Sequence, residues 1–228
     1  CAKDGFTSAY LTGHAFKKAL SQENSEVMEY SKVRGIEILK NNFKIFLENN
    51  EDITAKRIVL AGGVWLEEML SWLNVKIPIK CLINQLIITE RMPTVMKTVL
   101  SIANGLLSLK QFDNGTVLIG GGWQGLGDKE RGGVEAIPEN LRGNIRLACH
   151  AIPALRSGRM VRVWLGLEAE TADALPIIGN VPGISNAYVI GSVHSGYTSG
   201  PYMGWLLSQF IMGQETDMPL FEPSRLIN

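Results

Sequence analysis

Short runs of apolar residues that end at glycine form the clearest hydrophobic pattern in this chain. The run Ile58-Val59-Leu60-Ala61 consists of strand-forming residues and is followed by Gly62-Gly63, which predicts a central parallel strand covered on both faces. Residues 116–119 end at a glycine triplet in the same way, and residues 187–190 end at Gly191. Because the glycine triplet 120–122 has no side chains, we expect another group to approach the backbone closely there.

Shorter apolar segments predict five further strands. They cover residues 27–30, 33–39, 43–47, 81–89 and 160–167. The sequence Lys40-Asn41-Asn42 predicts a hairpin turn between two of these strands, because Asn tolerates positive φ. In the last segment the odd-numbered valines and leucines alternate with even-numbered residues such as Arg162 and Trp164, which predicts a half-buried strand.

Apolar residues spaced three and four positions apart predict four helices. They span residues 10–20, 66–73, 138–152 and a last segment that begins at Pro201 and ends at Gly213. Pro201 suits a first helical turn, where a missing N–H costs little, and Pro153 ends the third helix. Together, the predicted helices and strands indicate a mixed α/β (α+β) fold with an antiparallel component.

Composition limits the classes of function. The chain has 228 residues, 46% of them apolar, and is long enough for one or two domains. Its 22 basic residues balance its 22 acidic residues, which argues against nucleic acid or a charged membrane surface as a partner and favours a small ligand. No uncharged apolar run of about 18 residues and no signal pattern occurs, so we expect a soluble, cytoplasmic protein without a transmembrane segment.

Several kinds of site are not expected. Cys1, Cys81 and Cys149 are widely separated, which argues against a disulfide framework and a zinc site. We find neither a cluster with metal-ligand spacing nor a Ser-His-Asp order with a nucleophile elbow. The glycine-rich residues 120–127 lack a following Lys-Ser/Thr, so they do not predict a phosphate loop. The chain begins with Cys1 and not with an initiator Met. We therefore expect that the chain was truncated or cut by proteolysis, with a natural two-chain enzyme as the alternative.

A strand, a glycine loop and a helix in succession form the most informative local arrangement. Residues 188–190 lead into the loop from Gly191 to Gly200, and the helix is predicted to begin at Pro201. A helix N-terminus presents unpaired N–H groups and a partial positive charge, which favours a ligand atom that is or becomes negative. The alternative is a strand-to-helix turn in which glycine only supplies positive φ.

Three motifs carry a resemblance to a known family. They are the string from Gly166 to Gly179, the loop Gly191-Ser192-Val193-His194-Ser195-Gly196 and the segment from Ile58 to Trp65. With them the chain resembles the FAD-dependent amino-acid and amine oxidoreductases of the glycine oxidase, sarcosine oxidase and D-amino-acid oxidase type. It lacks the Gly-x-Gly-x-x-Gly fingerprint that such proteins carry near their start.

The resemblance implies a domain organisation and a cofactor. Residues 1–65 and 155–228 would form the remainder of an FAD-binding domain with a partial parallel sheet. Residues 66–154 would form a substrate-binding domain with an antiparallel sheet. The implied cofactor is FAD, and no metal is implied. The residues implied to bind the cofactor are Val33, Ala61, Gly62, Trp65, Gly166, His194, Ser195, Gly196, Tyr197 and Thr198.

The substrate side departs from the family at Glu168, where the amino-acid oxidases usually hold an arginine that pairs with the substrate carboxylate. A glutamate would repel that carboxylate and attract an ammonium group. Glu168, Trp123 and Arg162 are the candidates for substrate binding, and His194 and Glu168 are the candidates for catalysis. Alternatively, Glu168 is a solvated surface residue, or Arg162, Lys110 or Arg131 supplies the cationic clamp. His14 and His150 are expected to be structural.

The implied function is oxidation of the C–N bond of an amino acid or secondary amine by hydride transfer to FAD. Without the first βαβ unit, this chain is expected to hold FAD poorly and to share it with an N-terminal segment or a separate chain that carries the nucleotide-binding half. The alternatives are a non-catalytic subunit or remnant of the same fold that serves assembly or binding, and an unrelated α/β binding domain.

Overall fold

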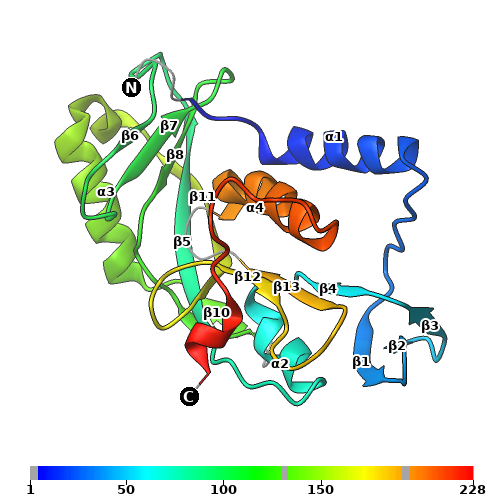
Figure 1. Cartoon of the computed structure of the whole chain (residues 1–228). Helices are drawn as coiled ribbons and strands as arrows, with labels where there is room; N and C mark the ends of the chain where they lie inside the picture. Colours follow the sequence, from blue (N-terminus) through cyan, green and yellow to red (C-terminus); the bar gives the residue numbers. More distant parts are fainter. Residues whose placement is uncertain (1–4, 130–132, 192–195, 228) are drawn as a thin grey trace. The chain divides into compact units, whose positions relative to one another are not determined.

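The computed structural model describes residues 5–129, 133–191 and 196–227 (Figure 1). The chain divides into two compact units. The antiparallel unit contains Cys81–Glu168 and the N-terminal segment up to Thr7, and the mixed unit contains Ser8–Lys80 and Ala169–Asn228. Both sheet types confirm the predicted mixed α/β fold. The predicted assignment of residues 1–65 and 155–228 to the cofactor and of residues 66–154 to the substrate stays a prediction.

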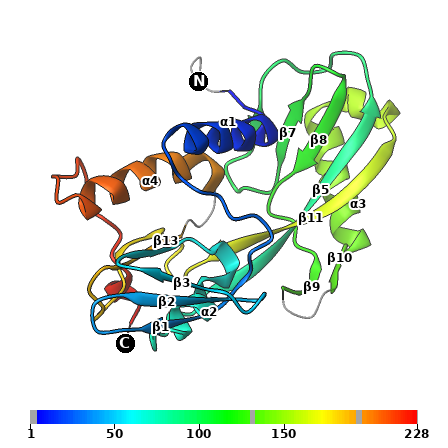
Figure 2. The same cartoon turned by 90° about the vertical axis from the view of Figure 1, so that its right-hand side faces the viewer.

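The antiparallel unit is built on one five-stranded sheet. Its strand order is β11 (Met160–Glu170), β5 (Lys80–Arg91), β8 (Thr116–Gly120), β7 (Ser108–Gln111) and β6 (Leu100–Ser101). Helix α3 (Pro138–Ala151) and the 3₁₀ helix η2 (Pro153–Ser157) cover one face of this sheet (Figure 2). A separate antiparallel pair consists of β9 (Leu126–Asp128) and β10 (Gly133–Glu135).

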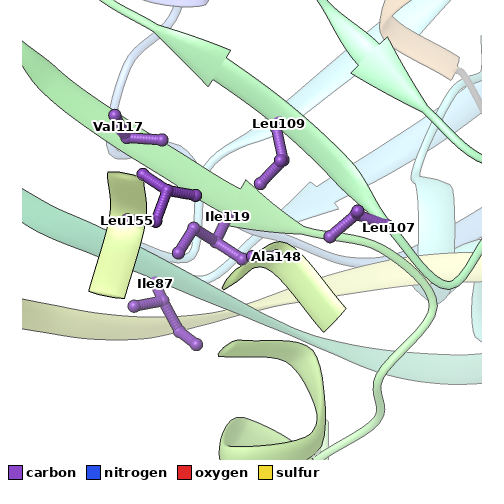
Figure 3. Packing of buried hydrophobic residues seen from close by; sticks show 7 residues of the cluster. All are labelled: Ile87, Leu107, Leu109, Val117, Ile119, Ala148 and Leu155. Carbon is purple, nitrogen blue, oxygen red and sulfur yellow. The ribbon is translucent and has the colours of Figure 1, made fainter. Parts of the chain in front are cut away.

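The core of the antiparallel unit lies between this sheet and α3. Ile87 pairs with Ile119 across β5 and β8, and Leu109 pairs with Ile119 across β7 and β8, so the three side chains share one face. Ala148 and Leu155 pack against them from the helical side (Figure 3). The opposite face of the sheet remains partly exposed, as expected for an antiparallel sheet covered on one side.

The glycine triplet after β8 is approached closely by the chain's own backbone. Gly121 has φ +130°, and a Cβ atom there would lie 2.6 Å from the carbonyl carbon of Leu106. The Gly122 N–H donates to the Gly105 carbonyl at 2.9 Å. The predicted close approach is therefore confirmed, and the hairpin between β6 and β7 accounts for it.

The mixed unit contains a three-stranded sheet with the order β12 (Ile177–Asn180), β13 (Ala187–Gly191) and β4 (Ile58–Leu60). Strand β13 pairs antiparallel with β12 and parallel with β4, which confirms the predicted parallel strand. The prediction of a central, doubly covered strand is wrong, because β4 is an edge strand and Val59 is 46% exposed. An apolar run predicts a largely buried strand, but it does not show whether the strand has neighbouring strands on one side or on both.

A second sheet of the mixed unit is the antiparallel meander of β1 (Val33–Ile38), β2 (Phe43–Leu47) and β3 (Asp52–Ala55). The predicted hairpin is confirmed, and the Leu39 N–H donates to the Asn42 carbonyl at 2.8 Å. The predicted strand at residues 27–30 is wrong. Tyr30 has φ 59°, which ends extended backbone there, and the segment lies in a turn.

The predicted helices are present, but the last one begins earlier than predicted. Helix α1 (Ala9–Gln22) is capped by Ser8, and the 3₁₀ helix η1 (Gly63–Trp65) leads into α2 (Leu66–Ser71). Helix α4 (Gly196–Ile211) contains Pro201 in its second turn, so the prediction that it begins at Pro201 is wrong. Proline removes one N–H, to which the Tyr197 carbonyl would otherwise bond, and α4 continues past this single loss. Gly213, with φ +71°, follows the helix end as predicted.

Among the residues that the structure describes, no helix is long and apolar enough to cross a membrane. The cytoplasmic location stays a prediction.

Arg225, in the 3₁₀ helix η3 (Pro223–Leu226), fastens the C-terminal segment to the mixed unit. Its Nε donates to Asp173 Oδ2 at 2.8 Å, and its terminal nitrogens donate to the carbonyls of Phe221 (2.7 Å) and Pro176 (2.7 Å). The Arg225 guanidinium holds the pKa of Asp173 well below its ordinary value of 3.8. Asp173 belongs to the Gly166–Gly179 motif, and here it anchors the chain's end.

We expect Asp173→Asn to lower the free energy of unfolding by about 1–2 kcal/mol at pH 7, because it removes a charge-assisted pair that is a quarter to a third exposed. A depressed carboxyl pKa stabilises the fold above its unfolded value, so the deficit should shrink as the pH falls below 3.8. Urea titrations of both proteins across this range measure it. Lys32→Met, which removes an exposed ion pair with Glu48, is the control and should change stability little. If the loss of stability in Asp173→Asn did not change with pH, the Asp173 carboxylate would not stabilise the fold through its pairing with Arg225.

Candidate functional site

The carboxyl ends of β4 and β13 meet at one edge of the mixed unit's sheet. The two strands are parallel and in register, with Leu60 opposite Val189. After β4 the chain continues into Gly62 and η1, and after β13 it continues from Gly191 toward α4. In open α/β sheets, ligands bind outside the carboxyl ends of parallel strands. This edge is therefore the first part of the candidate site.

Packing within the fold leaves little room for a side chain at either glycine here, and least at Gly191. A Cβ atom on Gly191 would lie 2.5 Å from Leu66 Cδ1, and one on Gly62 would overlap the sulfur of Met69. Leu66 is 1% exposed, so its side chain has little room to move away. Because these glycines have no side chains, η1 and α2 can pack close to the carboxyl ends of β4 and β13.

The first turn of α4 supplies backbone donors beside this edge. Gly196, Tyr197 and Thr198 form that turn, and no acidic side chain lies in it. The N–H groups of a first helical turn point out of the helix toward its N-terminal side. The Tyr197 hydroxyl lies 2.7 Å from the Thr12 hydroxyl on α1. The helix start therefore offers an electron-rich group both hydrogen-bond donors and a partial positive charge. The predicted site residues His194 and Ser195 lie outside the described residues.

The remaining predicted cofactor residues of the mixed unit lie in two separate places. Ala61 and Trp65 flank Gly62 at the strand edge, and Trp65 is 44% exposed. Val33 begins β1 in the meander and pairs with Leu47. The structure thus places Ala61, Gly62 and Trp65 in one short segment after β4, and Val33 on a separate sheet.

The predicted substrate residues belong to the antiparallel unit. Val163 packs toward α3, so the alternation along β11 turns Arg162, Gly166 and Glu168 to the open face of the sheet. The predicted half-buried alternation is incomplete, because Val161 is 61% exposed although it is on the same side as Val163. Arg162 and Glu168 are six positions apart along the strand, roughly 20 Å at 3.3 Å per residue. They cannot hold the same end of a small ligand.

Glu168 belongs to a hydrogen-bonded network that the sequence did not reveal. Asn84 on β5 donates to Glu168 through Nδ2, and Gln124 donates to Asn84 through Nε2. The Ile83 N–H donates to Gln124 Oε1 at 2.8 Å. The sequence signal was weak: Asn84 is one of two adjacent amide residues in strand β5, and its partner Gln124 lies forty positions away. Glu168 is therefore not a plain solvated surface carboxylate.

The other cations and aromatic residues considered for the substrate side have different surroundings. Lys110 Nζ lies 5.3 Å from the centroid of the Phe6 ring and 5.6 Å from that of Phe112. Trp123 donates its indole N–H to the Leu106 carbonyl at 2.8 Å and packs against Gly143 of α3. Both contacts are within the fold, and a role of Trp123 in substrate binding stays a prediction. Arg131 lies outside the described residues.

Little else in the described residues indicates a reactive centre. Within residues 5–129, 133–191 and 196–227, no group of three His, Cys, Asp or Glu side chains could hold a metal ion. Burial raises the pKa of the Cys81 thiol, which disfavours the reactive thiolate. His14 contacts Tyr10 edge-to-face, with ring centroids 4.4 Å apart, and its structural role stays a prediction.

These features define a class of protein: a two-unit α/β protein with a ligand edge at parallel strand ends and a separate antiparallel sheet that is open on one face. A family model described as DAO, FAD dependent oxidoreductase, matches residues 1–210. The chain belongs to this family of FAD-dependent oxidoreductases, as the sequence motifs predicted.

Comparison with individual proteins shows how much of their length this chain matches. The chain is 25% identical over 230 residues to an opine oxidase subunit of Rhizobium meliloti, covering 99% of this chain and 58% of the relative. Its fold matches L-proline dehydrogenase from P. horikoshii with a TM-score of 0.85 at 23% identity, covering 95% of this chain and 59% of that one. Glycine oxidase from Geobacillus kaustophilus matches with a TM-score of 0.82 at 19% identity, covering 94% and 57%. The chain thus spans somewhat more than half the length of these proteins.

We expect Gly191→Ala to destabilise the protein by about 1–3 kcal/mol, because the new methyl group overpacks against Leu66. Combining it with Leu66→Ala should cost less than the sum of the two single changes, since the shortened side chain makes room. Urea unfolding of all four proteins gives the coupling. Gly200→Ala, where no atom lies within 4 Å of the added Cβ, is the matched control and should not destabilise. If the two free-energy changes simply add, contact with Leu66 is not the reason that position 191 needs a glycine.

Proposed function

We propose that this chain is part of an FAD-dependent enzyme that oxidises the C–N bond of an amino acid or secondary amine to an imine, which water hydrolyses. The observation that carries the proposal is the α4 N-terminus beside the carboxyl ends of β4 and β13, with no acidic side chain in its first turn. This donor set fits the electron-rich edge of a flavin. When bound, FAD supplies the acceptor for a hydride that leaves the C–H bond next to the nitrogen.

The chain's own residues would bind and orient both reactants. Ala61, Gly62 and Trp65 would line the cofactor beside β4, and the backbone N–H groups of residues 196–198 would donate to it from the start of α4. Gly166 is proposed to face the cofactor from β11. Val33, His194 and Ser195 keep the cofactor roles that the resemblance implies, with His194 also proposed to accept a proton. These contacts would orient the cofactor, which is the protein's main contribution in such enzymes.

Glu168 is proposed to select the substrate. A carboxylate at this position repels a substrate carboxylate and attracts a protonated amine. Arg162, roughly 20 Å along the strand, would act on another part of an extended substrate. The preferred substrate would therefore be an amine that carries no carboxylate next to its nitrogen.

We further propose that a nucleotide-binding half, in the same polypeptide or on a separate chain, covers two surfaces of the mixed unit. One is the free edge of β4, where Val59 is 46% exposed. The other is α1, which has no buried residue and borders an apolar groove of about 660 Å³ against α4, lined by Phe16, Pro201 and Trp205 among others. Support comes from the greater length of the relatives and from the name of the Rhizobium meliloti relative, which describes one part of an opine oxidase.

Cofactor retention tests the proposed division. Residues 1–228 alone should purify colourless or lose flavin readily, because the pyrophosphate-binding turn would lie on the other half. Supplying that half, in the natural reading frame or by co-expression, should restore a flavin spectrum. Absorbance after gel filtration measures both. A tight stoichiometric yellow complex of residues 1–228 alone would contradict the division, and so would an absence of flavin with every added segment.

Anaerobic flavin bleaching tests the activity. Amines without a carboxylate should bleach the flavin of the complete enzyme at least about tenfold faster than glycine or sarcosine, because Glu168 repels the carboxylate. Stopped-flow absorbance gives the rates. If no amine bleaches the flavin, the chain is a non-catalytic subunit or remnant that serves assembly or binding. Faster bleaching by glycine or sarcosine would contradict the substrate preference alone.

A further inference from the structure

A line of amide side chains crosses the open face of the antiparallel sheet and ends at Glu168. The Ile83 N–H donates to Gln124 Oε1 at 2.8 Å, Gln124 Nε2 donates to Asn84 Oδ1, and Asn84 Nδ2 donates to Glu168 Oε2. Every bond in this series points in the same direction. An amide has one donor end and one acceptor end, so fixing the first orientation fixes the next.

The direction of the series makes Glu168 its terminal acceptor. The backbone N–H of Ile83 can only donate, so it holds Gln124 with Oε1 inward and Nε2 toward Asn84. Rotating either amide by half a turn would place two acceptors or two donors against each other. The Asn84 NH₂ group therefore faces position 168, where a carboxylate is the best acceptor.

Backbone bonds hold Gln124 rigidly. The Gly125 N–H donates to the Ile83 carbonyl at 2.7 Å, and the Gln85 N–H donates to the Trp123 carbonyl at 2.9 Å. Asn140 Nδ2 donates to the Gln124 carbonyl at 2.7 Å. A side chain whose backbone is fixed in this way loses little freedom when it orients a neighbour.

Half-buried apolar side chains lie on the same face of the sheet, beyond Asn84. Leu86 and Ile88 follow Asn84 on the same side of β5, and Leu118 pairs with Ile88 from β8. These side chains are half-buried. A carboxylate beside an apolar surface binds a cation more strongly than one in open water, because less solvent screens the pair of charges.

We propose that Asn84 and Gln124 are positioning residues that orient the Glu168 carboxylate on this face of the sheet as a binding site for a protonated amine. The site deepens the proposed function, on which it rests for the identity of the substrate: Asn84 and Gln124 set the charge preference and Glu168 makes the contact. Loss of a charge-assisted hydrogen bond to the carboxylate should weaken cation binding roughly tenfold.

Binding of a cation that cannot be oxidised tests the proposal directly. The probe is tert-butylammonium, which has no C–H bond next to its nitrogen, and pivalate is its anion of matching shape. The protein is expressed from its natural reading frame, and the side-chain amide NMR signals of Asn84 and Gln124 are followed during titration. We expect saturable shifts with tert-butylammonium and none with pivalate. Equal binding of pivalate, or no binding of the cation, would overturn the proposal.

Four variants separate positioning from a general effect on the fold. Glu168→Gln should abolish cation binding, and Asn84→Leu and Gln124→Leu should each weaken it about tenfold while their melting temperatures stay close to that of the parent. Glu168→Gln should also move the Asn84 side-chain amide signals in the absence of any probe. Glu139→Gln, on exposed α3, removes the same charge and should leave binding unchanged. Undiminished binding in Asn84→Leu, or unmoved Asn84 signals in Glu168→Gln, would refute the relay.

The two hypotheses fail in different ways. If no amine reduces the flavin but tert-butylammonium binds and depends on Asn84, the proposed reaction is wrong and the site stands. If amines bleach the flavin at rates that Asn84→Leu and Gln124→Leu do not change, and the cation probe does not bind, the reaction stands and the relay is refuted.

Discussion

The parallel pairing of β4 with β13 is the constraint on which the candidate cofactor site depends. Parallel strands end at the same edge of a sheet, so this pairing brings Gly62 and Gly191, separated by more than half the chain, next to each other. A Cβ atom at either position would overlap α2, at Met69 for Gly62 and at the buried Leu66 for Gly191. The glycines that look like ligand-binding signatures are thus also packing requirements. A glycine motif therefore points to a cofactor site only when a second feature, such as the backbone N–H groups at the start of a helix, lies beside it.

The antiparallel unit meets a different requirement. Its sheet buries one face against α3, where Ile87, Leu109 and Ile119 form the core, and leaves the other face half-exposed. That open face carries an ordered polar series, ending at Glu168, above apolar residues. An apolar surface with a few oriented polar groups is typical of small-molecule sites. The two units thus supply different chemistry: backbone donors in one, and an oriented carboxylate in the other.

The sequence predicted most of the fold because its strands and helices have strong local signals. The parallel strand at Ile58, the hairpin at residues 40–42 and the helix ends at Pro153 and Gly213 follow from side-chain pattern and turn chemistry. Pro201 misled because proline is commoner at a helix start than in a second turn, and a single lost hydrogen bond left the helix intact. The Asn84 network could not be predicted, because amide orientation depends on partners distant in sequence.

The carboxylate of Glu168 has a further chemical consequence for amine oxidation. A C–H bond next to nitrogen gives up hydride only when the nitrogen lone pair is free, so a bound ammonium group must first lose its proton. A carboxylate that binds this ammonium stabilises its charged form and also offers the proton an acceptor. The Asn84 side chain donates a hydrogen bond to this carboxylate and so fixes its orientation. If Glu168 holds the ammonium group in its charged form, as proposed, proton removal falls to another group, and this is the role proposed for His194.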